Sequence, residues 1–339
     1  MFRLATLLTV LLAACGSGVQ QDPNSGSLFT WSARAALPLP RTDHALVGLG
    51  GKLYALGGFS GSTLARVDAY DPASDTWTRR ADLLTARREF AAGALNGKIY
   101  AACGMSWSDP NAVTYVNTTE QYDPVADAWT TRAPCPIGPA SNNVYGNEHV
   151  GGSAAANGRL YMVVFNVIAP GGAATYEYDP VADHWTTKAP PPFSSDVYAL
   201  ADVNGALYLL ASQSYGANPR AESKLAQYDP ASDVWIIRAP LAGVWWPGLA
   251  AVNGKLYAVG GATATGGFNS PPGVRATGVL GSVNEYDPAA DRWTRRGQLG
   301  VARLSPGAAV LGSSLYVTGG SSATSQFAPA PLATVEEGQ

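Results

Sequence analysis

The sequence is poor in charged residues and in histidine, and these scarcities exclude several classes of protein. Charged residues make up 14% of the 339 residues, against roughly 25% in ordinary globular domains, while apolar residues make up 46%. The chain is therefore not disordered, because disorder requires few apolar groups and much charge. The formal net charge of −3 gives no positive field for nucleic acid, so we expect no nucleic-acid partner. Three histidines without clustered ligands give no metal signature, and we expect no cofactor.

Cysteine is also scarce, and its three residues are too few for a disulfide framework. Cys15 follows a positive start, Met1-Phe2-Arg3, and an apolar run over residues 4–14. This run is too short to span a bilayer as a helix, and the pattern is typical of an export signal. The ending Leu12-Ala13-Ala14-Cys15 resembles a bacterial lipoprotein signal, which implies cleavage before Cys15 and lipidation of its thiol.

This resemblance divides the chain into a signal peptide (1–14), an acylated cysteine with a flexible tether (15–28) and one folded domain (29–339). The alternative is an ordinary signal peptide followed by a coincidental cysteine. We expect an exported bacterial lipoprotein at the outer membrane, either on its periplasmic side or at the cell surface. The lipid anchor is then its only membrane contact.

Internal repetition is the strongest signal in the sequence. Tyr-Asp-Pro occurs five times, beginning at positions 70, 122, 178, 228 and 286, and a tryptophan follows seven residues after each tyrosine. A small turn with a β-rich run, such as NGKIYAACG at 96–104, occurs six times. Asn-Gly is a strong hairpin signal, and Asp-Pro is turn chemistry. Each unit therefore contains four short strands, and such units stack radially into a propeller.

The two ends of the repeat array give the number of units. The sixth unit stops at Val335-Glu336-Glu337, within its third strand, whereas Thr30-Trp31-Ser32 supplies a fourth strand with nothing before it. Trp31 lies 23 residues before Tyr54, the spacing that other units show. We therefore predict an all-β, six-bladed β-propeller whose last blade is closed by the N-terminal strand around Trp31, which removes two open sheet edges.

The apolar run, the Gly-Gly pair, and the Tyr and Trp at fixed spacing resemble the kelch repeat family over about 29–339. Some units depart from the pattern: Cys103 replaces one glycine, and Val164-Phe165 and Ala211-Ser212 replace two of the pairs. The resemblance implies a propeller that binds proteins, sugars or other ligands, with a few enzymes among its members. The fold alone therefore does not give the function.

The loops of such a blade lie at two ends of the propeller. Those joining the second strand to the third, and the fourth strand to the next blade, share one end, which we call the loop face; the other end is the turn face. Loop length varies on the loop face, where function usually lies. Because the first strand is innermost, we expect charged groups before it to converge at the mouth of the central channel. With nearby aromatic residues, the candidate ligand-binding set is Arg41, His44, Arg87, Arg88, Trp107, Tyr145, Glu148, His149, Asp196, Trp245, Trp246 and Arg303.

Arginine offers donors in a fixed geometry to carboxylates. An arginine-rich and aromatic mouth suits a sugar, an acidic sugar or an acidic peptide loop. The alternative is structural, with the arginines tying adjacent blades together through backbone carbonyls. We interpret the charges that recur in every blade, above all the aspartates of the Asp-Pro-x-x-Asp turns, as turn caps and inter-blade pairs.

We predict a monomeric binding module for a glycan or an extracytoplasmic protein. The alternative is a sugar mutarotase or epimerase of the sialic-acid type, with Glu148, Glu89 or His149 as acid or base beside an arginine; whether the protein is an enzyme stays open. Pairing of Cys103 with Cys135 also stays open. The second and fourth strands lie roughly 10 Å apart, beyond the normal reach of a disulfide, unless the loop of Cys135 folds inward.

Overall fold

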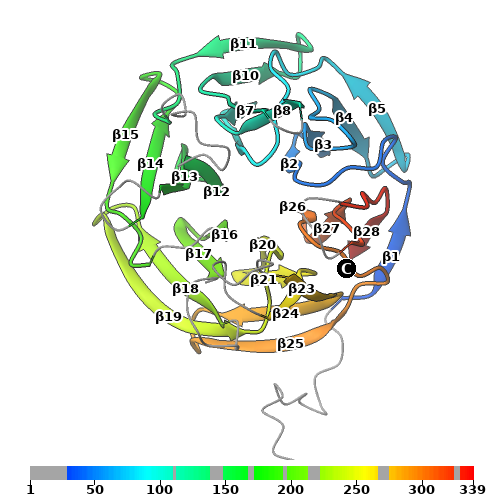
Figure 1. Ribbon diagram of the computed structural model, residues 1–339, viewed down its shortest axis with the longest axis vertical. Coiled ribbons are helices and arrows are strands. Elements are labelled where there is room, and N and C mark those ends of the chain that lie inside the picture. Colours follow the sequence, from blue (N-terminus) through cyan, green and yellow to red (C-terminus); the bar gives the residue numbers. More distant parts are fainter. Residues whose placement is uncertain are drawn as a thin grey trace, which may run out of the picture.

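The described residues form six four-stranded antiparallel sheets arranged as blades around a central axis (Figure 1). The computed structural model describes residues 29–109, 112–137, 148–166, 172–193, 197–212, 222–265, 275–323 and 329–339. The expected signal, Cys15 and tether lie outside these ranges. Among the described residues, no helix has the length and apolar character needed to cross a bilayer.

Each blade runs outward from an inner strand, and the inner strands of neighbouring blades contact one another around the ring. Blade one consists of β2 (Ala45–Leu49), β3 (Lys52–Leu56), β4 (Val67–Asp71) and β5 (Thr76–Arg80). Blade two consists of β6 (Ala91–Leu95), β7 (Lys98–Ala102), β10 (Thr119–Asp123) and β11 (Ala128–Arg132). Blade three consists of β12 (Glu148–Ala156), β13 (Arg159–Asn166), β14 (Ala173–Asp179) and β15 (His184–Lys188).

The second half of the ring repeats this order. Blade four consists of β16 (Val197–Val203), β17 (Ala206–Ser212), β18 (Glu222–Asp229) and β19 (Val234–Ala242). Blade five consists of β20 (Gly248–Val252), β21 (Lys255–Val259), β24 (Ser282–Asp287) and β25 (Arg292–Gln298). Blade six consists of β26 (Gly307–Leu311), β27 (Ser314–Thr318), β28 (Val335–Gly338) and β1 (Trp31–Arg34). Two extra hairpins stand on the loop face: β8 (Met105–Asp109) with β9 (Ala112–Tyr115), and β22 (Ala262–Thr265) with β23 (Arg275–Val279).

Closure of the ring by the N-terminal strand is confirmed. Strand β1 pairs antiparallel with β28, with Trp31 opposite Gly338 and Arg34 opposite Val335. An ion pair between Arg34 and Glu337 joins the same two strands. In Figure 1, the blue β1 lies beside the red β28, so segments from the two ends of the repeat array complete one blade.

The turns of each blade follow from the sequence. At the turn between β6 and β7, Asn96 and Gly97 have φ values of 52° and 73°, which is the left-handed pair that a tight hairpin turn requires. At the turn between β10 and β11, the carboxylate of Asp123 accepts from the backbone N–H of Val125 (2.9 Å). The turn-cap interpretation of this aspartate is therefore confirmed.

A hydrogen-bonded junction of one kind joins each of blades one to five to the blade before it. Asp127 of blade two accepts from the hydroxyl of Tyr122 (2.6 Å) and from the backbone N–H of Ala81 (3.0 Å), which follows the outer strand of blade one. The indole of Trp129 donates to the carbonyl oxygen of the same alanine (2.9 Å). Equivalent aspartates join neighbouring blades at the described junctions through Asp75, Asp127, Asp183, Asp233 and Asp291.

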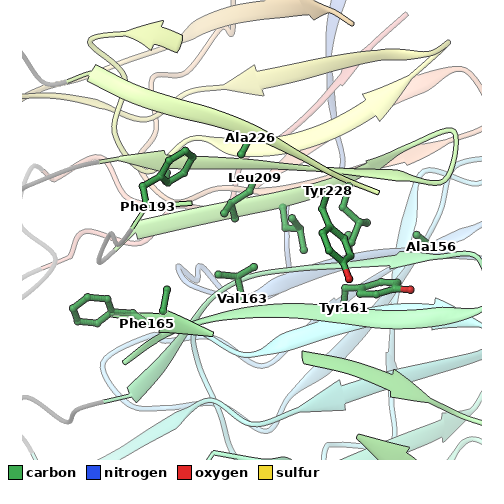
Figure 2. Packing of buried hydrophobic residues seen from close by; sticks show 13 residues of the cluster. Ala156, Tyr161, Val163, Phe165, Phe193, Leu209, Ala226 and Tyr228 are labelled. Atoms are coloured by element: carbon green, nitrogen blue, oxygen red, sulfur yellow. The ribbon is translucent and has the colours of Figure 1, made fainter. Parts of the chain in front are cut away.

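The hydrophobic core lies between the blades. Figure 2 shows the cluster between blades three and four, where Tyr161 and Val163 of β13 lie opposite Leu209 of β17 and Tyr228 of β18. These four side chains are at most 2% exposed. Each blade therefore buries its apolar residues against the next blade, and an isolated blade would leave them in water.

Cys103 and Cys135 form a disulfide, with their Cα atoms 5.8 Å apart. Cys135 lies three residues beyond the end of β11, so its position is not fixed by the spacing between the second and fourth strands. Its backbone N–H donates to the carbonyl oxygen of Asn117 (2.9 Å), which draws the loop inward. Both cysteines are buried, in the core between blades two and three.

Removing this disulfide will lower the stability of the protein. The bridge closes a sequence separation of 32 residues, for which the loss of chain entropy in the unfolded state predicts about 3–4 kcal/mol. We expect the Cys103→Ala/Cys135→Ala variant to unfold at correspondingly lower urea concentration. Wild-type protein treated with a reducing agent should unfold at the same midpoint as the variant. An unchanged wild-type midpoint after complete reduction would contradict a stabilising bridge.

Candidate functional site

A short connecting segment precedes each inner strand, and the described connections bond to the blades on both sides. Before blade two, the carbonyl oxygen of Arg87 accepts from the N–H of Gly58 in blade one (2.9 Å). The backbone of Arg88 pairs with Met105 in blade two (2.9 and 3.0 Å). The packing is close, because a Cβ on Gly57, whose φ is +57°, would lie 2.5 Å from the Arg87 oxygen. Glycine at position 57 is therefore a packing requirement.

A fully buried arginine stands in three of the described connections. The Arg87 side chain is 0% exposed, and its guanidinium donates to the carbonyl oxygens of Cys103 and Thr118 (3.0 Å each). It also pairs with the carboxylate of Glu120 on β10. The three described ion pairs of this kind are Arg41–Asp68, Arg87–Glu120 and Arg303–Glu336.

These placements correct the expectation that Arg41, Arg87 and Arg303 converge at the channel mouth. The backbone of each bonds to one blade and its guanidinium to the next, as in the structural alternative. Burial lowers the pKa of each guanidinium, and its carboxylate partner acts in the opposite direction. Breaking a buried pair costs about 3–5 kcal/mol, because it strands a charge. The three arginines therefore serve the fold, and we leave them out of the candidate site.

His44 also belongs to a blade junction. It is 8% exposed, its Nε2 lies 2.8 Å from Oγ1 of Thr318 in blade six, and a Cβ on Gly307 would lie 2.6 Å from that nitrogen. Burial, with added repulsion from Arg41 and Arg303, lowers the pKa of His44 to about 3. The imidazole is therefore neutral at physiological pH and packs between blades one and six.

Wherever it is described, the residue two positions before an inner strand adopts a left-handed backbone conformation. These residues are Asp43 (φ 53°), Glu89 (φ 49°), Trp246 (φ 47°) and Ser305 (φ 47°), and we call them the inner rim. Neighbours are linked, because the N–H of Glu89 donates to the Asp43 oxygen (3.2 Å) and that of Ser305 to the Trp246 oxygen (3.1 Å). Strands β2, β20 and β26 lie near the centre of Figure 1, so the inner-rim residues that precede them lie close to the central axis at the loop face.

Two inner-rim carboxylates share one buried guanidinium. The Arg88 side chain is 2% exposed, and one of its terminal nitrogens lies 2.6 Å from a carboxylate oxygen of Asp43 and 2.9 Å from one of Glu89. The ring of Phe59 lies over the guanidinium, 4.9 Å from its central carbon. The carboxylates are less covered, with side chains 13% and 33% exposed. Arg88 therefore acts as a buried brace for two carboxylates that are less covered than it is.

The carboxyl group of Asp43 has a pKa raised to about 6. Burial is the main cause and the neighbouring Glu89 adds to it, whereas Arg88 and a hydrogen bond from Thr42 act in the opposite direction. The guanidinium therefore compensates the two carboxylates only in part. The Asp43 carboxylate is ionised at neutral pH at a cost in stability.

Blade five contributes the aromatic side of the inner rim. Trp245 is 2% exposed and its backbone pairs with Ala262 of β22, whereas Trp246 is half-buried. The two rings meet edge to face, with centroids 5.9 Å apart. Trp246 packs against the small buried cluster formed by Ala262 and Leu304. Of the two tryptophans, Trp246 is the one with surface to offer a ligand.

Comparisons with known proteins agree with this architecture. A model of the kelch motif matches residues 40–84 and 86–136. Kelch-like protein 30 of Homo sapiens is 37% identical over 216 residues, covering 64% of this chain and 34% of the relative. Kelch-like protein 35 of Mus musculus is 25% identical over 241 residues, covering 70% and 30%. The chain spans about a third of the length of these relatives.

A solved structure described as "Structure of YjhT" matches with a TM-score of 0.67 at 15% identity, over 89% of this chain and 96% of that chain. That likeness shows a shared fold. The chain is a six-bladed β-propeller with kelch motifs in its first two blades. Kelch propellers are typically used for binding, which directs attention to the loop face and its inner rim.

Several predicted site residues of the propeller lie outside the described residues in whole or in part. Trp107 lies in β8, and Glu148 and His149 begin β12, but their side chains are not described. Tyr145 and Asp196 lie outside the described ranges. Within those ranges, no group of three or more His, Cys, Asp or Glu side chains could hold a metal ion.

Asp43 is the functional candidate that the sequence reasoning missed. It occupies the position of Glu89 in the preceding unit, because Arg41-Thr42-Asp43 and Arg87-Arg88-Glu89 align. A second overlooked signal concerns the buried arginines. In blades one and two, an acidic residue stands two positions before the repeat tyrosine; these residues are Asp68 and Glu120. Blade five has neither member of the pair, because Val244 stands at the arginine position and Asn284 at the acid position. The arginine and its acid therefore occur together.

The Asp43→Asn variant of the kelch propeller should be more stable than wild type at neutral pH. Because the folded-state pKa of about 6 exceeds the ordinary 3.8, wild-type stability falls as pH rises from about 4 to 6. Asparagine keeps an oxygen for Arg88 and tolerates the left-handed backbone. We expect a melting temperature a few degrees above wild type at pH 7.5, and a gain that vanishes towards pH 4.

The matched control is Asp287→Asn on the turn face, where the hydrogen bond from Lys255 lowers the pKa of the carboxyl group. This variant should lose stability at neutral pH, and its difference from wild type should fade as pH falls. A loss of stability in Asp43→Asn that is equal at every pH would contradict the assignment of a costly carboxylate to Asp43.

Proposed function

We propose that the protein is an exported, lipid-anchored and monomeric binding module that recognises a glycan or a protein ligand through its loop face. The inner rim forms the centre of that surface. Asp43, Glu89 and Trp246 supply two carboxylates and an indole ring, a combination of polar and aromatic groups that suits recognition of a polar ligand.

The observation that carries this proposal is one backbone conformation occupied by different side chains. On the turn face, left-handed positions repeat the same residue, as Asn96, Asn157, Asn204 and Asn253 do. Asparagine favours this conformation, so these residues serve the turn. The inner rim holds a comparable backbone in four described blades but carries Asp, Glu, Trp and Ser.

Tryptophan at φ 47° is the sharpest case, because a bulky residue is disfavoured there. Such strain persists where the surroundings enforce it and is concentrated at functional sites. At this position the backbone is fixed by hydrogen bonds to Ser305 and, through Trp245, to Ala262. The side chain is thus free to vary for recognition.

A second candidate function, a sugar mutarotase or epimerase, is favoured by one observation. The Asp43 pKa of about 6 lies near neutral pH, where a general acid or base is most effective. Glu89, one of the predicted acid/base residues, lies on the same guanidinium. Asp43 and Glu89 are therefore the described residues that would carry proton transfer in such an enzyme.

A Trp246→Ala variant tests the proposed recognition surface. A ligand bound to the native state raises the melting temperature by mass action. We expect a member of a panel of sugars and glycans to raise the melting temperature of the wild-type propeller. The variant, measured against its own ligand-free melting temperature, should lose at least half of this rise, because the indole surface is gone.

Ile237→Ala is the matched control, because Ile237 is 66% exposed on the outer strand β19. Its ligand response should equal that of wild type. A response that survives in Trp246→Ala would refute the inner rim as the recognition surface. A bound sugar whose anomers exchange faster with wild type than with Asp43→Asn would favour the mutarotase over the binding module.

The proposed lipid anchor depends on Cys15 and its preceding signal. In a bacterial host, a Cys15→Ser variant should incorporate no labelled palmitate and should leave the membrane fraction, since the thiol that carries the lipid is missing. Wild-type protein should be labelled and should sediment with membranes. Unlabelled wild-type protein that is nevertheless exported would favour the ordinary signal peptide.

A further inference from the structure

The outer strand of blade four differs from the other outer strands because it carries large apolar side chains in contact with solvent. Val234, Ile236 and Ile237 of β19 are 48%, 46% and 66% exposed. At the positions of the two isoleucines, blades six, one, two, three and five carry Ser-Ala, Thr-Arg, Thr-Thr, Thr-Thr and Thr-Arg. The Ile-Ile pair is therefore not a requirement of the repeat. Exposed apolar residues gathered on one element mark an interaction surface.

One side of β19 is bonded to no other strand. In the described sheets, β19 is the outermost strand of blade four and pairs only with β18. The free stretch ends at Ala239, whose N–H donates to Asp291 (2.9 Å) and whose carbonyl oxygen accepts from the indole of Trp293 (2.9 Å). The next residue, Pro240, has no N–H. Residues 234–238 therefore form a short free edge, to which an extended segment can add as a further strand.

The side chains of this free edge divide between two faces, because successive residues of a strand point to opposite sides. Ile237 shares the face of Trp235, whose indole donates to the carbonyl oxygen of Ala189 in blade three (2.9 Å). Ile236 and Arg238 share the other face, and the charge of Arg238 acts on groups of blade five. Each face of the free edge thus presents one large apolar side chain.

Arginines stand beside the free edge without carboxylate partners. Strands β19 and β25 contact each other, and their sequences VWIIRAPLA and RWTRRGQ contain four arginines and no acidic residue. Among the described residues, only Arg296 of these four forms an ion pair. Arg238 donates to the neutral amide of Gln227 (2.6 and 3.0 Å). Arg295 lies two residues after Trp293, and therefore on the face of β25 that meets β19.

The aspartates nearest in sequence to these strands are engaged at the blade junctions. Asp233 and Asp291 each accept from their own repeat tyrosine and from the backbone of the preceding blade. They lie at the turn-face ends of β19 and β25, so they compensate the arginines only in part. Guanidinium groups bind carboxylates strongly. A partner that suits the free edge therefore combines apolar with acidic side chains.

We propose that the free edge of β19 binds an extended acidic segment of another protein. The segment adds as a strand along residues 234–238, its apolar side chains cover Ile236 and Ile237, and its carboxylates bind Arg238 and Arg295. In Figure 1, β19 and β25 run along the outer perimeter of the ring, away from the central axis. The inference goes beyond the proposed function, because it adds a second binding surface to the loop face.

A labelled peptide of six alternating valine and glutamate residues is the probe, and a peptide of valine and lysine is its control. On the free edge, the valines of the first peptide can cover Ile237 while its glutamates point towards Arg238 and Arg295. Fluorescence polarisation with the full-length protein at neutral pH measures both affinities. We expect the glutamate peptide to bind at least about tenfold more tightly, because its charges complement the arginines. Equal affinities of the two peptides would overturn the proposal.

The variant Ile236→Thr/Ile237→Thr removes the apolar side chains and keeps the fold, because Thr-Thr occupies these positions in blades two and three. We expect it to bind the glutamate peptide at least about tenfold more weakly than wild type does, since the apolar contact is lost. The matched control is Val125→Ala/Val181→Ala, which removes side chains that are 93% and 82% exposed on the turn face. Its affinity should equal that of wild type. Undiminished binding in the threonine variant would contradict the assignment to β19.

Two further outcomes identify other occupants or another site. Wild-type protein that dimerises in sedimentation velocity, while Ile236→Thr/Ile237→Thr stays monomeric, would make a second copy of this chain the occupant and overturn the acidic segment. Peptide binding that Trp246→Ala abolishes would place the peptide at the inner rim and overturn the proposal for β19. Peptide binding that the threonine variant loses, with no sugar response in wild type, would support the proposal and count against the glycan part of the proposed function.

Discussion

The junction between consecutive blades is the interaction on which the ring depends. An aspartate accepts hydrogen bonds from its own repeat tyrosine and from the backbone of the preceding blade, as Asp127 does with Tyr122 and Ala81. The repeat tryptophan then donates to the same backbone unit, as Trp129 does. Because the core also lies between blades, no blade is complete alone. The strand pair β1–β28 closes the ring, because it joins the N-terminal strand to the last unit of the repeat array.

The inner rim is possible because other groups fix its backbone. In blades six, one and two, which are contiguous, a buried arginine and its acid tie the connecting segment to the blade that follows. In blade five, where Val244 takes the place of the arginine, Trp245 pairs with the hairpin that begins at Ala262. The inner-rim residue in each of these blades contributes little to the anchor, so its side chain can differ from blade to blade. A uniform scaffold thereby presents Asp, Glu, Trp and Ser around one axis.

The sequence predicted the fold from particular residues, because a repeat multiplies each local signal. The Tyr-Asp-Pro spacing, the Asn-Gly turns and Trp31 gave six blades and their closure, all of which the structure shows. The site was less accessible. Arg87 resembles a ligand-binding residue until Glu120 is found buried beside it, and the two are 33 residues apart in the chain. The sequence leaves the cysteine pair open, because Cys135 lies in a loop beyond its strand and the spacing between strands does not place it. Burial is a property of the packed ring, and the pairing of Arg87 with Glu120 becomes visible in the sequence only when the arginine and the acid are compared across units.

A crystal structure of the protein soaked with the sugar that raises its melting temperature most would test the central claim most directly, because it locates the ligand without reliance on variants. The account predicts the sugar at the loop-face end of the central axis, in contact with the indole ring of Trp246. A sugar bound instead on the turn face or on the outer strands, with the inner rim unoccupied, would contradict it.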